Sequence, residues 1–380
     1  MLDRVADYAG CLAAPQDWAV ATIVSVRGSS PSPVGTSMAV SADLRIIGSL
    51  SGGCVESSVA ALAQDAIAEG RPRLESFGPD GTLFEQQGLD VALTCGGEIE
   101  VLIQPLSTLD GETLERLRSL SRKEAREPAE LSRRIRLDEA AGPDQTAEPA
   151  AEPQTAPSED SVGSAPRELL VEERREGAPV LFLSGVHDVS VHLARLALQA
   201  GWRVRMVDVR PAFATAERVP DGVELAVGEP VTALREKVLA APAGAWTAVC
   251  VMTHHPDLDV PVLDAALSEG GRTISFLGAM GSRRAGSRRA RALEERGHSP
   301  ASIASVHTPL GLDIQASTAA ETAVSMFAEL IAARNAAAGG EAEAEPDDAG
   351  ARTGAPLSEK TGPVSRSRRR SISITREMAA

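Results

Sequence analysis

The chain has 380 residues, enough for two domains that each bury a hydrophobic core. Its 53 acidic and 38 basic residues give a net charge of −15, and only 3% of residues are aromatic. Both values argue against a nucleic-acid partner, which requires clustered Lys and Arg or stacking aromatic side chains.

The opening MLDRVADYAGCLAAP lacks the apolar run of a signal peptide, and no stretch reaches the roughly 18 apolar residues of a membrane span. No membrane-spanning segment is therefore expected. The four cysteines are widely spaced and form no CxxC pair, so no secreted disulfide framework is expected either. The sequence therefore predicts a cytoplasmic protein with reduced thiols.

The first domain, residues 1–110, is expected to be a small β-rich α+β unit. Strands are predicted where β-branched and apolar residues gather, over 18–26, on both sides of a turn at 41–43, over 91–94 and over 98–106. A helix is predicted to begin after Gly53 and to end before Gly70, because apolar residues recur on one face between these glycines.

Residues 138–166 and 337–380 have the composition of disordered chain. Both are rich in Pro, Ala and acidic residues and show no apolar periodicity, so they cannot bury enough surface to offset the entropy of ordering. We expect 138–166 to be a linker that follows a charged helix over 111–137, and 337–380 to be a solvated tail. Limited proteolysis is expected to cut in the linker and to leave two folded fragments.

The second domain, residues 167–336, is expected to be a Rossmann-like, doubly wound parallel sheet. Apolar runs of strand length alternate with helix-length segments throughout it, which is typical of an α/β fold. Strands are predicted over 178–184, 202–209, 223–227, 246–253 and 272–278, with a closing helix over 319–335. Ligands in this architecture bind beyond the carboxyl ends of the strands.

Two cysteines of the first domain lie in glycine turns. Cys54 follows Gly52 and Gly53 at the predicted helix start, and Cys95 precedes the pair Gly96–Gly97 after a strand. Unpaired N–H groups and the helix dipole at such a start favour a thiolate, and glycine allows the backbone to approach a ligand. The alternative is that both cysteines are small buried residues without a further role.

The loop after the first strand of the second domain reads SGVH, whereas a dinucleotide fingerprint requires G-x-G-x-x-G there. Val186 stands where a glycine would let the backbone approach a pyrophosphate. Asp208 does occupy the place of a ribose-binding acid at the end of the next strand. The fold thus suggests a dinucleotide while the loop argues against NAD(P).

The fourth strand opens into THHPDLD, which contains His254 and Asp259. These residue types bind metals or polar ligands, but an aspartate in this segment can also cap a helix. Both interpretations remain open from the sequence.

The following strand opens into GAMGSRR, where Gly281 and Ser282 lead into a helix that begins with Arg283 and Arg284. N–H groups, helix dipole and guanidinium groups at such a place favour a phosphate. The alternative is a solvated basic helix face. A smaller contribution is expected from the arginines at 288, 289 and 291.

Together these motifs resemble the XdhC/CoxI family of xanthine dehydrogenase accessory proteins. The matching segments run through both domains in the order of the family: GSSPSPVG, GSLSGGCVE, CGGEIEVLIQPL, VDVRPAFA, THHPDLD, FLGAMGSRR and TPLGLDI. Two places differ, because the usual Pro-Arg is Pro31-Ser32 here and the usual GAGH-like turn is SGVH.

The resemblance implies a cofactor chaperone more than an enzyme in its own right. Such a protein would bind molybdenum cofactor (molybdopterin) transiently, support its sulfuration with a cysteine desulfurase, and deliver it to an apo molybdenum hydroxylase such as xanthine dehydrogenase. A homodimer is expected on the same ground. Cys54 would serve as a soft molybdenum ligand or as a sulfur carrier. The competing hypotheses are an NAD(P)-dependent oxidoreductase and a non-catalytic scaffold.

Overall fold

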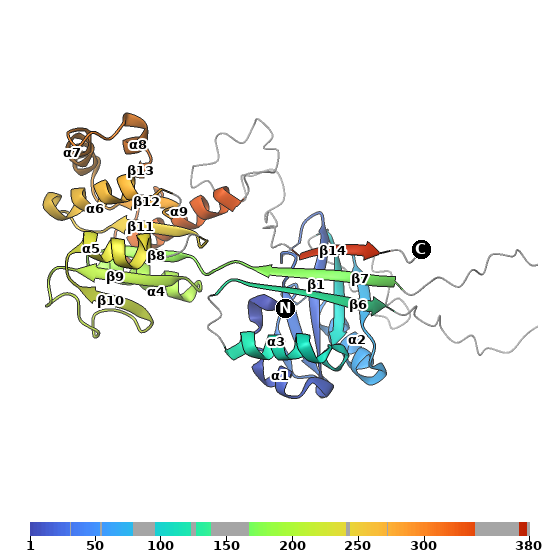
Figure 1. Cartoon of the computed structure of the whole chain (residues 1–380). Helices are drawn as coiled ribbons and strands as arrows, with labels where there is room; N and C mark the ends of the chain where they lie inside the picture. The colour runs from blue at the N-terminus through green and yellow to red at the C-terminus, as the bar shows by residue number, and fades with distance from the viewer. Residues whose placement is uncertain are drawn as a thin grey trace, which may run out of the picture. The chain divides into compact units, whose positions relative to one another are not determined.

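The structure is a computed structural model that describes residues 1–30, 32–53, 55–78, 96–122, 127–137, 167–240, 244–271, 273–338 and 372–377. These residues form two compact units (Figure 1). The first takes the described parts of 1–125, 129–175 and 363–380, and the second those of 126–128 and 176–362. The predicted fold class is confirmed, since the first unit is antiparallel and β-rich and the second contains a parallel sheet.

The first unit is built on a five-stranded antiparallel sheet in the order β3-β2-β1-β5-β4. Its strands are β1 (Trp18–Arg27), β2 (Ser37–Ser41), β3 (Ile46–Gly48), β4 (Arg73–Phe77) and β5 (Glu98–Pro105). Helix α2 (Glu56–Glu69) packs on one face of β1 and β5 and ends at Gly70, which is left-handed with φ 63°. The helix predicted between Gly53 and Gly70 is therefore confirmed, and it ends directly before Gly70 as expected.

The opposite face of the same sheet carries a second core. Because side chains alternate along a strand, Ala19 and Ile23 of β1 join the core under α2, while Trp18 and Val20 join the other. That second core contains residues of α1 (Ala9–Ala13), α3 (Gly111–Arg122) and the 3₁₀ segments Leu2–Arg4 and Leu106–Thr108, and a further 3₁₀ segment, Pro15–Asp17, leads from α1 into β1. The sheet is thus buried on both sides.

A three-stranded antiparallel sheet, β14-β7-β6, completes the first unit. It consists of β6 (Ala129–Leu137), β7 (Arg167–Arg175) and β14 (Ile372–Glu377). The charged helix expected over 111–137 is therefore wrong over Ala129–Leu137, which form a strand, while α3 occupies Gly111–Arg122. Apolar residues of β6 are buried at every second position, as in Leu131 and Ile135, and Arg133 is buried with them, while the residues between are exposed.

This sheet also moves the boundary between the units. The sequence assigns residues 167–175 to the second domain and 372–377 to the tail, but both segments pair within the first unit. Arg133 of β6 is buried, donates to Gln104 at 2.5 Å and forms an ion pair with Glu173 of β7. The residues expected to form the linker, 138–166, lie outside the described residues.

The second unit is a six-stranded parallel sheet in the order β10-β9-β8-β11-β12-β13. Its strands are β8 (Val180–Ser184), β9 (Arg203–Asp208), β10 (Val223–Val227), β11 (Thr247–Val251), β12 (Phe276–Ala279) and β13 (Val306–His307). The strand order reverses at β8 and β11, so the carboxyl ends of these two strands mark the usual ligand crevice of such a sheet.

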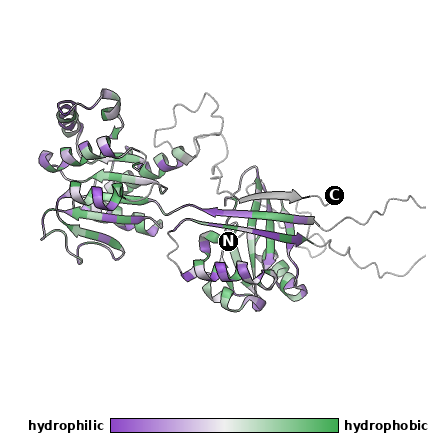
Figure 2. Ribbon diagram, viewed as in Figure 1, coloured by the Kyte–Doolittle hydropathy of each residue, from purple (hydrophilic) through white to green (hydrophobic). Residues whose placement is uncertain are grey.

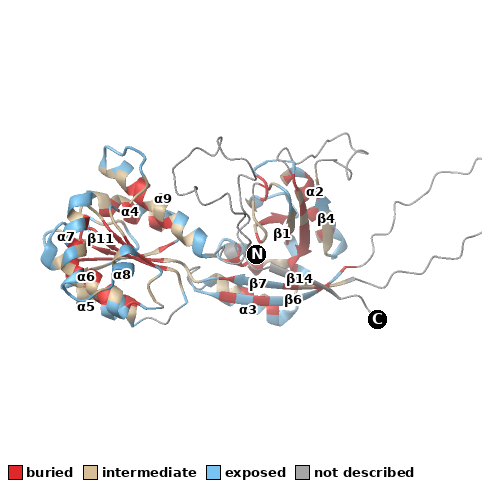
Figure 3. Cartoon of the chain, turned by 90° about the horizontal axis from the view of Figure 1, so that it is seen from above, coloured by how far each residue is buried: buried red, intermediate tan, exposed pale blue. Residues whose placement is uncertain are grey.

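Helices cover both faces of the parallel sheet. They are α4 (Asp188–Gln199), α5 (Pro230–Leu234) with a π turn (Arg235–Leu239), α6 (Pro256–Glu269), α7 (Arg283–Glu294), α8 (Pro300–Ala304) and α9 (Ala319–Ala338). Helices α4 and α9 share one core, and α5, α6 and α7 share the other. Figure 2 shows the apolar strands between amphipathic helices, and Figure 3 shows the same strands as buried.

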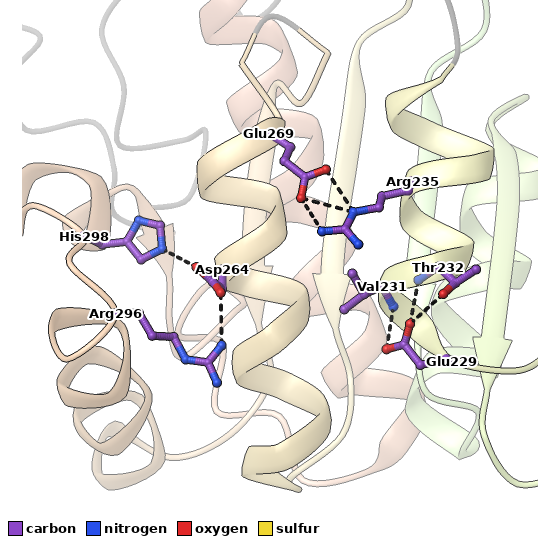
Figure 4. A network of polar contacts seen from close by, with 8 residues as sticks. All are labelled: Glu229, Val231, Thr232, Arg235, Asp264, Glu269, Arg296 and His298. Carbon is purple, nitrogen blue, oxygen red and sulfur yellow. Dashed lines mark hydrogen bonds and ion pairs between the residues drawn. The ribbon is translucent and has the colours of Figure 1, made fainter.

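Surface ion pairs hold α6 to its neighbours (Figure 4). Asp264 accepts from Arg296 at 3.0 Å and His298 at 2.7 Å, and Glu269 pairs with Arg235. Glu229 caps α5 by accepting from the N–H groups of its first turn. These contacts join surface helices to one another, so they serve the fold. Among the described helices, none combines the length and apolar character that crossing a bilayer requires.

The shared sheet revises the proteolysis expected from the sequence. A cut within 138–166 leaves β6 and β7 on different fragments, although they pair over their whole nine-residue length. We expect two bands on a denaturing gel but one peak in native gel filtration, because the strands and the buried Arg133–Glu173 pair hold the fragments together. Two separate native peaks would contradict the pairing.

Candidate functional site

The cysteine loop, residues 49–55, connects β3 to α2 and closes around the carboxylate of Glu56, the first residue of α2. Seven donors of the loop converge on this one group. Oε1 accepts from Ser49 Oγ (2.6 Å) and from the N–H groups of Leu50 (3.0 Å), Ser51 (2.8 Å) and Gly52 (2.9 Å). Oε2 accepts from Ser51 Oγ (2.7 Å) and from the N–H groups of Gly53 (2.9 Å) and Val55 (3.2 Å).

The charge state of Glu56 follows from these contacts. Partial burial by itself would raise the pKa of Glu56, but the hydrogen bonds from Ser49, Ser51 and the loop backbone outweigh it and hold that pKa well below its ordinary value. The carboxylate is therefore an anion at any physiological pH. Its position at the N-terminus of α2 is also favourable, because the helix dipole is positive there.

The two glycines of the loop are explained by their backbone conformation. Gly52 and Gly53 have φ values of 81° and 127°, and a Cβ on either would meet nothing within 4 Å. Positive φ turns their N–H groups inward to Glu56, so these two loop donors are paired within the protein. Cys54 itself lies outside the described residues.

The second glycine pair has a different role. Cys95 lies outside the described residues, and Gly96 has a φ of 72°. A Cβ on Gly97 would come within 1.9 Å of the carbonyl oxygen of Ser29. Gly97 is therefore required by the close packing of its own backbone on the loop after β1, and no ligand is needed to explain it.

In the second unit, Asp259 and Arg289 form a buried ion pair near the carboxyl end of β11. They are 1% and 6% exposed, and Arg289 donates to Asp259 Oδ2 from Nε (3.0 Å) and Nη2 (2.6 Å). Thr253 completes the group, because its hydroxyl donates to Asp259 Oδ1 and its carbonyl accepts from Arg289 at 3.1 Å. Both oxygens of Asp259 are thus occupied within the protein. In the described part of the chain no cluster of His, Cys, Asp and Glu could hold a metal.

The turn before α7 brings Gly281 next to two residues of this edge. Gly281 has a φ of 134°, and a Cβ there would lie 3.3 Å from Arg289 Nη1 and 3.5 Å from His254 Nδ1. Arg289 Nη1 is buried and has no hydrogen-bond partner among the described residues. Arg289, for which the sequence predicts only a smaller contribution, is therefore the arginine that contacts the turn from inside, and His254 lies exposed beside it.

Ser282, Arg283 and Arg284 form the start of α7. Ser282 caps the helix by accepting from the N–H of Ala285 at 3.2 Å. Arg283 and Arg284 are exposed, and within the described ranges no residue accepts from their backbone N–H groups. The start of α7 thus keeps the donors and the positive charge that an oxyanion requires.

Asp208, at the position of a ribose-binding acid, already binds other residues of the protein. Asp208 accepts from the N–H of Val186 at 2.8 Å and from three nitrogens of Arg210 at 2.8–2.9 Å. Burial would raise the pKa of Asp208, but these hydrogen bonds lower it, so the group stays ionised. Arg210 also lies 3.8 Å from the ring centroid of Phe213. A ribose could reach Asp208 only by displacing Arg210.

His187 stands at the start of α4 on the same sheet edge. Its Nε2 donates to the carbonyl of Met252 at 2.7 Å, which fixes the proton on that nitrogen. Burial lowers the pKa of His187, so the ring is neutral near pH 7. Sequence reasoning missed Glu56, Arg210 and the buried role of Arg289. Of these three, only the contact of Arg210 could have been predicted from the local sequence, because Arg210 follows its partner Asp208 by two residues.

Comparison with known families gives two matches. The XdhC and CoxI family matches residues 11–78, and the XdhC Rossmann domain matches residues 181–330. The first match contains the cysteine loop, and the second contains Asp208, Asp259 and the start of α7.

Two curated relatives and one solved structure are also similar. The molybdenum cofactor insertion chaperone PaoD of Escherichia coli is 27% identical over 320 residues, 82% of each chain. A probable xanthine dehydrogenase subunit of Bacillus subtilis is 31% identical over 163 residues, 43% of this chain and 45% of its own. A crystal structure described as a xanthine dehydrogenase from Bacillus halodurans has a TM-score of 0.63 at 22% identity, covering 90% of this chain and 98% of its own, which shows a shared fold.

The buried pair predicts a difference among the arginines of α7. Arg289→Ala leaves Asp259 buried without its cation and should lower the free energy of unfolding by about 3–5 kcal/mol. Arg288→Ala, an exposed control one residue away, should change it by less than about 0.5 kcal/mol. Urea unfolding measures both, and coincident curves would contradict the structural role of Arg289.

Proposed function

Because the chain belongs to the XdhC and CoxI family, we propose that it binds molybdenum cofactor and acts in the maturation of a molybdenum hydroxylase such as xanthine dehydrogenase. The similarity to a relative named as a molybdenum cofactor insertion chaperone, which spans 82% of both chains, supports this proposal. The observation that carries it is the cysteine loop, which lies within the family match and whose backbone is fixed on both sides of Cys54.

In this proposal the cofactor is cargo, and Cys54 contacts its metal. A cysteine sulfur is a soft ligand and suits molybdenum better than the oxygen ligands nearby. The protein presents the held cofactor to a cysteine desulfurase for sulfuration and then transfers it to the apo hydroxylase. Cys95, with Gly96 and Gly97, is the second candidate contact. The homodimer remains a prediction from the resemblance.

A separate part of the proposal is an oxyanion site in the second unit, considered by itself. The N–H groups of Arg283 and Arg284, the hydroxyl of Ser282 and the α7 dipole all favour an oxyanion at Gly281. His254 is exposed next to this turn and is available to the same ligand. Asp259 supports the turn through Arg289 and does not touch the cargo in this proposal.

The alternative is an NAD(P)-dependent oxidoreductase, and the structure gives it little support. Both oxygens of Asp208 accept hydrogen bonds from within the protein. Val186 keeps a side chain in the loop where a pyrophosphate would need glycine. The strand-end crevice is therefore assigned to a phosphate group of the cofactor and not to a nicotinamide dinucleotide.

The test is purification from a molybdenum-replete host, followed by molybdenum, pterin and nucleotide analysis. Wild type should carry molybdopterin, and Cys54→Ser should fold normally yet retain about tenfold less, because serine oxygen is a poor molybdenum ligand. Cys250→Ser is the control, since Cys250 is buried in β11 and should show only a packing cost. Equal retention by Cys54→Ser would exclude Cys54 as a ligand, and bound NAD in place of pterin would favour the oxidoreductase.

The phosphate assignment predicts a salt-dependent loss. The double variant Arg283→Ala with Arg284→Ala should bind molybdopterin about tenfold more weakly at low salt, with a smaller loss at high salt where charges are screened. The matched control removes two exposed arginines further along the same helix, Arg288 and Arg291. Titration of apoprotein at two salt concentrations measures the effect. Equal affinities of the two double variants would contradict the phosphate site and would favour the alternative, in which Arg283 and Arg284 only form a solvated helix face.

A further inference from the structure

The cysteine loop has the geometry of an anion-binding nest that already contains an anion. Five backbone N–H groups and two serine hydroxyls point at one place, and the carboxylate of Glu56 fills it. Nests of this kind in other proteins receive a phosphate or another external oxyanion. Here the chain supplies the occupant from the first residue of its own helix.

The internal occupant reaches both sides of Cys54. Gly53 precedes the cysteine and Val55 follows it, and both donate their N–H groups to the same oxygen, Glu56 Oε2, at 2.9 and 3.2 Å. The other oxygen binds the part of the loop that leaves β3. One side chain therefore binds the residue before Cys54 and the residue after it.

The glycines depend on this arrangement as well. Gly52 and Gly53 both have positive φ, a conformation that glycine adopts without strain and that has little to stabilise it in a loop without an acceptor. In this loop the stabilising contact is the carboxylate, since both N–H groups end on Glu56. Without it, five inward N–H groups would face one another with no acceptor.

We propose that Glu56 is the positioning residue of the cysteine loop, an internal anion that holds residues 49–53 and Val55, on the two sides of Cys54, so that Cys54 can meet the molybdenum cargo. This inference rests on the proposed role of Cys54. It also assigns an orientation to the cargo, because a phosphate cannot enter a nest that Glu56 fills. In this proposal the metal end of the cofactor meets this loop, and no phosphate enters the nest.

The first test needs no cargo. Glu56→Gln keeps the shape of the side chain but replaces one accepting oxygen with an amide that cannot accept. Amide hydrogen exchange should show protection of Gly52, Gly53 and Val55 in wild type and a loss of about tenfold or more in the variant. The matched control is Glu69→Gln at the other end of α2, whose carboxylate is exposed and pairs with Arg73. Unchanged protection in Glu56→Gln would overturn the proposal.

The second test measures retained molybdopterin and uses chemical rescue. Glu56→Gln should retain about tenfold less than Glu69→Gln at an equal melting temperature. Glu56→Ala empties the nest, and sodium acetate should restore both loop protection and retention, because a free carboxylate can take the vacant place. Restored retention would show that an anion in the nest orders the loop, because acetate would not rescue a variant with a general folding defect.

Two outcomes separate this inference from the proposed function. If wild type and Glu69→Gln bind no molybdopterin, the proposed function fails and the positioning role fails with it. If wild type binds cargo while Glu56→Gln loses loop protection but retains cargo fully, the function stands and the positioning role is refuted. Failure of acetate to restore Glu56→Ala, while that variant melts as wild type does, would also refute it.

Discussion

Backbone N–H groups that turn inward where a strand ends or a helix begins must find an acceptor, and both units of this protein supply one as a carboxylate. In the first unit Glu56 accepts from five N–H groups among the described residues of the cysteine loop. In the second unit Asp208 accepts from Val186 in the loop after β8. A buried carboxylate needs several donors or a cation to remain ionised, so each of these groups fixes the loop around it.

The same constraint separates loops that can receive an anion from loops that cannot. In the loop before α2 the donors end on Glu56, and in the loop after β8 the N–H of Val186 ends on Asp208. The start of α7 has no internal carboxylate among the described residues, because Asp259 is engaged with Arg289 behind the turn. Of these three loops, the one before α7 is therefore the place that we propose for an external phosphate.

The parallel sheet could be predicted because its strands are continuous apolar runs between helix-length segments, a pattern that local sequence contains. The second sheet of the first unit could not be predicted in the same way. Residues 129–137 do alternate buried and exposed positions, but their charged residues also fit a helix, and the pairing strand begins only at residue 167. The site residues show the same limit. Arg289 pairs with a residue 30 positions earlier, and Glu56 looks like any acid at a helix start until the φ values of two glycines are known.

The sheet β14-β7-β6 has a consequence for biosynthesis. Its middle strand ends at Arg175 and the second unit begins directly afterwards, while the third strand, β14, comes only at residues 372–377. The Rossmann unit is thus an insertion between two neighbouring strands of another fold. During vectorial synthesis on the ribosome, the inserted unit is complete before the host sheet receives its last strand. Co-translational folding of this protein therefore finishes inner unit first, and the edge of β7 stays unpaired until the last part of the chain emerges.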